Sequence, residues 1–207
     1  MIFRHPNSLK SGMHLRMPVA LLLSFIGMSL YSAFAHAGTA EDDYRNAYTL
    51  YKKGRWQLAA NALGKYVSDH GKKKAPQLPF ARLYWGISLE NAEKYAEARK
   101  VLRKFVVDYP KNANTNDVLY RIAECSFFLD ELKIAETDFL TFIKKAPQHD
   151  FTEYAFPYLG DVQFRLNKTK AAEANFRKSL EKFKNGRMAG ISKLGLSRCL
   201  KVQKKPN

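Results

Sequence analysis

One pattern of fourteen residues occurs four times in the chain. The stretch GRWQLAANALGKYV at 54–67 aligns with EKYAEARKVLRKFV at 93–106, DELKIAETDFLTFI at 130–143 and NKTKAAEANFRKSL at 167–180. Its sixth position is always alanine, and this alanine recurs at intervals of 39, 37 and 37 residues. The four alanines are Ala59, Ala98, Ala135 and Ala172. Four copies in one register predict an array of helical repeats, because such units bury their apolar faces against their neighbours.

The pattern also predicts a turn and a helix crossing in each copy. We expect each hairpin to turn at the first position of the pattern, where Gly, Asp and Asn suit a turn. These positions are Gly54, Glu93, Asp130 and Asn167. Small residues let two helix backbones approach, and a bulky residue one turn along fills the space beside them. The small residues are Ala47, Gly86, Ala123 and Gly160, and the bulky ones are Leu63, Leu102, Phe139 and Phe176.

Helix ends are marked by prolines and by capping patterns. Pro110 and Pro147 follow the second helix of a hairpin, which proline cannot continue. Two pairs resemble capping boxes at helix starts. They are Thr39 with Asp42 and Asp150 with Glu153. Helical periodicity extends over nearly the whole chain, with no alternating strand pattern, so the sequence predicts an all-α fold.

The first 37 residues are typical of a secretory signal peptide. Basic residues without any acidic residue precede an apolar run from Pro18 to Ala37, which ends in Ala35-His36-Ala37 before Gly38. Translation starts at Met1 or at Met13. We expect cleavage near Ala37 and a periplasmic protein without a stable membrane span. The alternative is an uncleaved segment that anchors the chain in the inner membrane. Because no cysteine follows the apolar run, a lipoprotein anchor is excluded.

The remaining residues, 38–207, are strongly basic. They contain 32 Lys and Arg against 19 Asp and Glu, a net charge of +13. Export argues against nucleic acid as the partner, and an anionic envelope polymer, an anionic lipid or an acidic protein fits better. The basic loop with Lys72, Lys73 and Lys74 is one candidate contact. The alternative is that the positive charge simply solvates the exterior.

The repeated features resemble those of the tetratricopeptide repeat family. A small residue, an aromatic or similar residue, Ala-x3-bulky and then proline is that family's pattern, and the resemblance covers about residues 40–184. The intervals exceed the family's usual period of about 34 residues. Longer repeats of this kind look like an exported bacterial type. That type includes the repeat domain of the Tol-Pal-associated periplasmic protein and the repeat lipoproteins of outer-membrane assembly.

The resemblance implies a right-handed superhelical solenoid in a domain of residues 38–207. Its four helical hairpins are expected at 40–75, 79–112, 116–149 and 153–186. A C-terminal capping helix is expected at about 188–203, where apolar residues recur at helical spacing beside a basic face. Cys125 and Cys199 lie two repeats apart in this arrangement, so we expect them not to form a disulfide.

The resemblance also implies that the first helix of each hairpin lines a concave groove that binds a protein or peptide. The predicted protein-binding residues are Tyr48, Tyr51, Lys52, Glu90, Asn91, Glu124, Phe128, Asp161 and Arg165. Further groove-facing residues are Tyr44, Leu83, Ile87, Tyr120, Phe127, Tyr158 and Phe164. Aromatic anchors with three acids suit a segment that carries Arg or Lys, or a helix laid in the groove. The alternative is that the aromatic residues pack between helices and the acids are a solvated stripe.

Nothing in the sequence indicates an enzyme, a metal site or a cofactor site. The two histidines of residues 38–207, His70 and His149, fall near expected helix ends, and no nucleophile, phosphate-loop or metal-binding motif occurs. Glu90 and Glu124 could form a carboxylate pair for glycan cleavage, but their spacing does not favour it. We therefore expect an interaction scaffold of the cell envelope, in assembly, division or secretion. The alternatives are an accessory subunit of a peptidoglycan-processing enzyme and a direct binder of anionic polymer.

Overall fold

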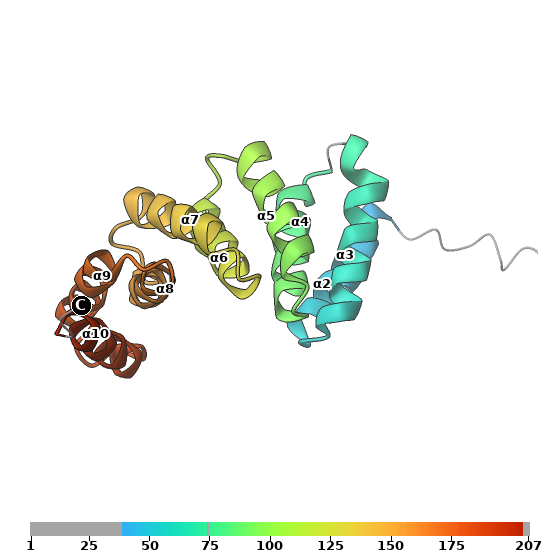
Figure 1. Cartoon of the computed structure of the whole chain (residues 1–207). Coiled ribbons are helices and arrows are strands. Elements are labelled where there is room, and N and C mark those ends of the chain that lie inside the picture. The colour runs from blue at the N-terminus through green and yellow to red at the C-terminus, as the bar shows by residue number, and fades with distance from the viewer. Residues whose placement is uncertain (1–38, 74, 205–207) are drawn as a thin grey trace, which may run out of the picture. The chain divides into compact units, whose positions relative to one another are not determined.

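The computed structural model describes residues 39–73 and 75–204, and the predicted signal peptide at 1–37 lies outside the described residues. The described part contains nine α-helices, one short 3-10 helix and no strand. Figure 1 shows the helices following one another in chain order. The elements are α2 (Ala40–Lys52), α3 (Trp56–His70), η2 (Gly71–Lys73), α4 (Leu78–Asn91), α5 (Tyr95–Asp108), α6 (Thr115–Phe128), α7 (Leu132–Lys145), α8 (Thr152–Arg165), α9 (Thr169–Lys182) and α10 (Ala189–Gln203).

The helices form four hairpins and one terminal helix. Each of α2, α4, α6 and α8 packs against the helix that follows it, and these four also contact one another in sequence. We call α2, α4, α6 and α8 the A helices, and the surface that they share the A-helix face. The last helix, α10, contacts both α8 and α9. It therefore occupies the place that the A helix of a fifth hairpin would have, and the all-α repeat fold is confirmed.

The four turns within the hairpins have one backbone geometry. Gly54, Glu93, Asp130 and Asn167 all have positive φ, at +65°, +59°, +59° and +60°. The N–H of the next residue donates in each case to the carbonyl five residues earlier, as from Arg55 to Leu50. Side chains other than glycine rarely adopt this left-handed region, so its recurrence at the predicted positions confirms the register of the repeat.

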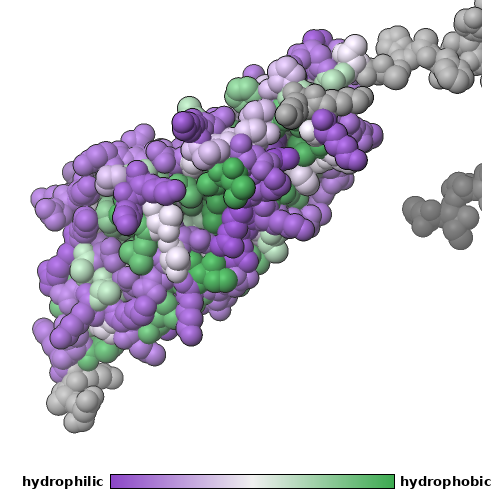
Figure 2. Space-filling view, turned by 90° about the horizontal axis from the view of Figure 1, so that it is seen from above, coloured by the Kyte–Doolittle hydropathy of each residue, from purple (hydrophilic) through white to green (hydrophobic). Residues whose placement is uncertain are grey.

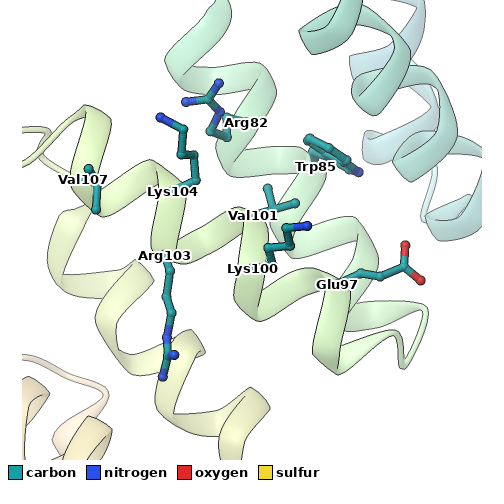
Figure 3. Close-up of a pocket in the computed structure, with 8 residues that line it drawn as sticks. All are labelled: Arg82, Trp85, Glu97, Lys100, Val101, Arg103, Lys104 and Val107. Atoms are coloured by element: carbon teal, nitrogen blue, oxygen red, sulfur yellow. The ribbon is translucent and has the colours of Figure 1, made fainter.

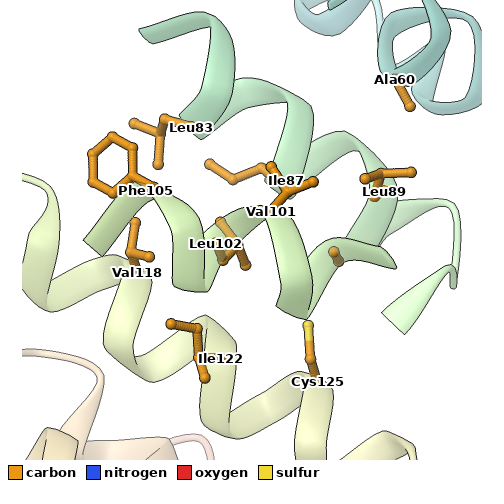
Figure 4. Packing of buried hydrophobic residues seen from close by; sticks show 11 residues of the cluster. Ala60, Leu83, Ile87, Leu89, Val101, Leu102, Phe105, Val118, Ile122 and Cys125 are labelled. Atoms are coloured by element: carbon orange, nitrogen blue, oxygen red, sulfur yellow. The ribbon is translucent and has the colours of Figure 1, made fainter. Parts of the chain in front are cut away.

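The predicted helix crossings are tightly packed. A Cβ atom on Gly86 would lie 2.3 Å from a methyl carbon of Leu102, and one on Gly160 would lie 2.8 Å from the ring of Phe176. The recurrent alanines of the four hairpins are fully buried. Figure 4 shows Leu102 within one of the resulting cores, which α4, α5 and α6 share. The small residues are therefore required by the close approach of the two helices of a hairpin.

One of the two predicted capping boxes is present. The Thr39 hydroxyl accepts from the backbone N–H of Asp42, and the Asp42 carboxylate accepts from the N–H of Thr39. The prediction for Asp150 and Glu153 is wrong. Helix α8 begins without a side-chain cap, because the Glu153 carboxylate accepts instead from the backbone N–H of Arg187, far along the chain.

Cys125 and Cys199 are free thiols, as predicted. Cys125 lies in the core between α4, α5 and α6, and Cys199 lies in a separate cluster with Ala172 and Phe176. No helix in the described part of the chain is long and apolar enough to cross a membrane.

Candidate functional site

Four tyrosines from two neighbouring A helices form a cluster on the A-helix face. Tyr84 of α4 packs on two tyrosines of α2, with ring centroids 4.9 Å from Tyr48 and 4.6 Å from Tyr51. Tyr44 stacks on Tyr48 from one turn earlier in α2, and all four rings are half-buried. Burial raises the pKa of Tyr84 to about 12. The cluster therefore joins the first and second hairpins as well as forming their shared surface.

The sequence missed the role of Tyr84. Leu83 and Ile87 were predicted to face the groove, and this is wrong because they are only 5% and 9% exposed and belong to the core. Successive residues of a helix point about 100° apart, so an error of one position moves a side chain from the surface into the core. The available signal was a tyrosine beside a leucine, six residues before the predicted acid Glu90.

A cleft follows the tyrosine cluster, between α4 and α6. It has a volume of about 270 Å³ and is lined by Glu90, Asn91, Glu93, Tyr95, Arg121, Glu124 and Phe128. The Glu90 side chain is only 8% exposed and accepts a hydrogen bond from the Arg121 guanidinium of the next hairpin. Glu124 accepts from the buried Tyr120 hydroxyl at 3.0 Å. Two carboxyl groups from different hairpins therefore share one arginine.

The two carboxyl groups of the cleft interact directly. The charges of Glu90 and Glu124 repel each other, and burial and the charge of Glu124 both raise the pKa of Glu90. Burial raises the pKa of Glu90 to about 7, while Arg121 opposes this rise and Glu124 adds to it. Burial also raises the pKa of Glu124, against the Tyr120 hydroxyl and Arg121. The cleft is therefore one positive charge short of balancing two ionised carboxylates.

An aromatic pair forms the rim of this cleft. Tyr95, at the start of α5, stacks on Phe128, at the end of α6, with ring centroids 4.8 Å apart. Phe128 remains 47% exposed, although it is a large apolar residue. The exposed Asn91 donates its side-chain amide to the carbonyl of Ile87 in the preceding turn. The rim thus presents an accessible ring beside buried carboxyl groups.

The remaining predicted residues of the A-helix face are divided between packing and the surface. Lys52 is exposed, and Tyr158 packs on Phe127 of the preceding A helix. In the fourth hairpin, Asp161 pairs with Arg198 of α10, and Arg198 also lies over the ring of Phe164. Arg165 pairs with Asp130 in the turn of the third hairpin. Of the predicted set, the structure brings together Glu90, Asn91, Glu124 and Phe128 in one cleft, and their role in binding stays a prediction.

A larger groove lies on α4 and α5, outside the predicted surface. Its volume is about 650 Å³, and Figure 3 shows that Trp85, Val101 and Val107 alternate there with cationic side chains. Most of this positive charge is already neutralised by neighbouring acids. Asp108 pairs with both Arg82 and Lys104, and Asp138 pairs with Arg103 at 3.0 Å. The groove is therefore less attractive to an anionic ligand than its cations alone indicate.

Other polar groups do not converge on a site of this kind. The Nε2 atom of His70 lies 3.3 Å from a carboxylate oxygen of Asp43, and the Nε2 atom of His149 lies 2.7 Å from a carboxylate oxygen of Asp117. Each histidine is near a helix end. Within the described residues, no group of three His, Cys, Asp or Glu side chains could hold a metal ion. Figure 2 shows apolar residues in separate patches among hydrophilic ones on the face turned to the viewer.

Comparison with known proteins shows which fold the chain shares with them. The model of the tetratricopeptide repeat family TPR_6 matches residues 80–112, which are the second hairpin. No curated protein sequence matches the chain. Among solved structures, a tetratricopeptide repeat protein from Parabacteroides merdae ATCC 43184 is similar, with a TM-score of 0.64 and 20% identity over 79% of this chain. The chain spans 60% of the length of that protein.

Two further solved structures have the same arrangement of helices. MamA of AMB-1 is 14% identical with a TM-score of 0.63, over 79% of this chain and 82% of its own. The apo form of RapI is 16% identical with a TM-score of 0.61, over 85% of this chain and 53% of its own. At these identities the likeness concerns the fold. The second hairpin thus matches the model of the tetratricopeptide repeat family, and the described helices have the fold of tetratricopeptide repeat proteins.

Proposed function

We propose that the chain is an exported interaction scaffold of the bacterial cell envelope that holds a lysine or arginine side chain of a partner protein in the cleft between α4 and α6. The tetratricopeptide repeat fold supports protein–protein interaction in general. Proteins of this kind are typically non-catalytic, and we propose the same for this chain. To this general role the proposal adds a preference for a cationic side chain and a location in the cell envelope.

The observation that carries the proposal is the charge balance of the cleft. Glu90 and Glu124 face a single guanidinium, that of Arg121, and burial and the charge of Glu124 raise the pKa of Glu90. An ammonium or guanidinium group placed beside them completes a set of two anions and two cations and favours the ionised form of Glu90. Buried charges are stable when each has an opposite partner, so the cleft favours a cation over a neutral or anionic group. Affinity is therefore expected to rise as the pH rises through about 7, where Glu90 ionises.

The size and rim of the cleft favour one side chain over a small-molecule ligand. Its volume of about 270 Å³ lies below the roughly 300–1,000 Å³ usual for small-molecule pockets. The faces of aromatic rings attract cations, and Tyr95 and Phe128 stand at the entrance. The same acids repel acidic segments, which adds selectivity by exclusion.

The location rests on the predicted signal peptide at 1–37. We propose cleavage near Ala37 and release into the periplasm, where the scaffold would serve envelope assembly, division or secretion. N-terminal sequencing of the protein recovered from the periplasmic and membrane fractions of its native cells tests this. A sequence that starts at Met1 or Met13 in the membrane fraction would instead support the uncleaved anchor.

Site-specific photocrosslinking tests the binding surface. A photoreactive residue at Phe128 should capture a partner in the native envelope, whereas the same residue at Val107, which is 74% exposed on α5, should not. The double variant Glu90→Gln and Glu124→Gln keeps the size of the side chains and removes their charge. It should weaken partner binding by tenfold or more, while Glu97→Gln in the groove on α4 and α5 should leave it unchanged.

A minimal ligand tests the cation specificity without a known partner. N-acetyl-arginine amide should shift the NMR signals of Tyr95 and Phe128, and its uncharged analogue N-acetyl-citrulline amide should not. Equal shifts with both compounds would contradict the proposal. Suppose that neutralising Lys72, Lys73 and Lys74 abolishes partner binding while the double variant Glu90→Gln and Glu124→Gln binds normally. The basic loop is then the binding surface, and an anionic polymer is the better ligand. Recovery of a peptidoglycan-processing enzyme at Phe128 would identify the chain as its accessory subunit.

A further inference from the structure

The positive charge of the chain is concentrated at its C-terminal end. Residues 165–204 contain twelve Lys and Arg against two Asp and Glu, a net charge of +10. Residues 39–164 contain nineteen against seventeen, a net charge of only +2. The segment from the end of α8 through α10 therefore carries most of the excess positive charge of the chain.

The outward side of α10 combines this charge with exposed apolar side chains. Lys193, Lys201 and Lys204 rim a groove whose floor contains Leu196 and Leu200, with a volume of about 670 Å³. None of the three lysines has an acidic partner among the described residues, which distinguishes this groove from the one on α4 and α5. Beside the groove on α10 lie Leu194, Ile191 and Val202, which are 63%, 51% and 50% exposed. Arg198 lies among them and is paired with Asp161.

Helix α9 and the loop after it extend the cationic surface. Lys178 and Lys182 lie over the ring of Phe156, at 5.2 and 5.9 Å from its centroid. Lys184 and Arg187 follow in the loop and are exposed. The two acids of this region, Glu173 and Glu181, are too few to neutralise these groups, and Glu173 is already engaged by Arg177 and Gln203. The end of the array is thus cationic on α9 and both cationic and apolar on α10.

From this charge and this amphipathic helix, we propose that the α9–α10 end of the array docks on the surface of a bilayer that contains anionic lipids. Helices with lysines on one strip and exposed apolar residues on the next lie in the headgroup region, where the lysines meet phosphates and the apolar side chains enter the acyl boundary. A hydrophilic polymer would use the lysines alone and leave Leu194 and Ile191 in water. This surface lies apart from the cleft between α4 and α6, so its docking does not depend on the proposed cation site.

Vesicle sedimentation tests the proposal with two lipid compositions. The chain from Gly38 onward is used, because Thr39–Asn207 forms a compact unit of its own and the apolar segment before it would bind vesicles by itself. The chain should bind vesicles of phosphatidylglycerol and phosphatidylcholine in equal parts, and not vesicles of phosphatidylcholine alone. Added salt should weaken the binding, because exposed charges are screened.

Matched variants separate the two contributions of α10. Charge reversal of Lys193, Lys201 and Lys204 to Glu should reduce vesicle affinity by about a hundredfold or more, at about 1 kcal/mol for each lysine near the surface. Reversal of Lys100, Lys111 and Lys133 changes the net charge equally and should have much less effect. The pair Leu194→Ser and Ile191→Ser should reduce affinity by about tenfold, and Val107→Ser should not reduce it. All of these side chains are exposed, so thermal melting should be retained in every variant.

Three outcomes would overturn lipid docking. Equal binding to phosphatidylcholine vesicles would show that the charge is not used. Equal losses in the two triple variants would show that only the total charge counts. If the serine pair binds vesicles normally and soluble polyglutamate competes as well as anionic vesicles do, the surface recognises a polyanion or an acidic protein, and not a bilayer.

Discussion

The cleft between α4 and α6 and the outward side of α10 carry charge in opposite ways. In the cleft, Glu90 is 8% exposed and hydrogen-bonded to Arg121, and two acids share one cation. On α10, three exposed lysines surround two leucines without an acidic partner among the described residues. Buried charges interact strongly and only at fixed positions, whereas exposed charges interact weakly and add together. The comparison shows two ways in which one chain holds charge: at fixed positions inside a cleft, and spread over an exposed helix.

The largest effect expected from this contrast is on Arg121. Replacing Arg121 with alanine leaves Glu90 buried without its cation, and should lower the free energy of unfolding by about 3 kcal/mol at pH 8. Arg198→Ala at the C-terminal end breaks a partly exposed pair with Asp161 and should cost less than about 1 kcal/mol. Urea unfolding of both variants measures this. Equal losses would mean that the cleft is as well solvated as the end of the array.

Substitutions at the buried helix crossings should cost similar free energies of unfolding in different repeats, unlike substitutions of charged residues. Ala98→Leu and Ala135→Leu place a larger side chain at a fully buried helix crossing, and each should destabilise the chain by about 1 to 3 kcal/mol. Ala96→Leu on the exposed side of the same helix as Ala98 should change stability by less than about 0.5 kcal/mol. Unchanged melting of both buried variants would mean that the alanines do not lie at crossings.

The C-terminal end differs from the middle in its surface and not in its packing. A Cβ atom on Gly195 would lie 2.3 Å from the Phe176 ring, so Gly195→Ala should destabilise by about 1 kcal/mol despite the better helix propensity of alanine. Gly190→Ala in the same helix meets nothing within 4 Å and should be neutral or slightly stabilising. A stabilised Gly195→Ala would show that α10 packs loosely on α9. The C-terminal end would then differ from the middle of the array in mobility as well as in charge. Thermal melts of the two variants decide this.

The cleft alone should also give the stability a pH dependence. The pKa of Glu90 is about 7 in the folded chain against an ordinary 4.5, so between these values the folded chain binds more protons than the unfolded chain. The free energy of unfolding should therefore fall as the pH rises from 4.5 to 7, by at most about 1.4 kcal/mol for each pH unit. Glu90→Gln should flatten this slope. The groups that interact with Glu90 are Arg121, Glu124, Cys125, Tyr120, Tyr51 of α2 and Tyr95 of α5. A slope that persists in Glu90→Gln must come from another group.

The register of the repeat could be predicted from the sequence to within a residue or two. The positive φ values at Glu93, Asp130 and Asn167 follow from that register, although none of these residues demands a left-handed backbone by itself. The crossing of Gly86 with Leu102 follows likewise. Such features depend on neighbours within one hairpin, and the hairpin recurs four times.

Contacts between hairpins could not be predicted in the same way. Glu90 is buried because Arg121 reaches it from 31 residues away, and no local pattern marks that pair. Glu153 fails to cap α8 because a backbone N–H 34 residues later takes its carboxylate. The face shown by Tyr84 depends on how α4 packs on α2, which the repeat period does not set. The sequence therefore predicted the two acids of the cleft, but not their interaction or the single arginine beside them.

The uneven charge along the array has a consequence that acts before any contact is made. With +10 on residues 165–204 and +2 on residues 39–164, an anionic surface exerts a torque on the chain as well as an attraction. The chain turns until α9 and α10 lead, over distances set by the Debye length. The cleft between α4 and α6 is separated from that end by α8, so docking through α9 and α10 would leave the cleft open to a partner. The uneven charge of the array would thus set its orientation relative to the anionic surface.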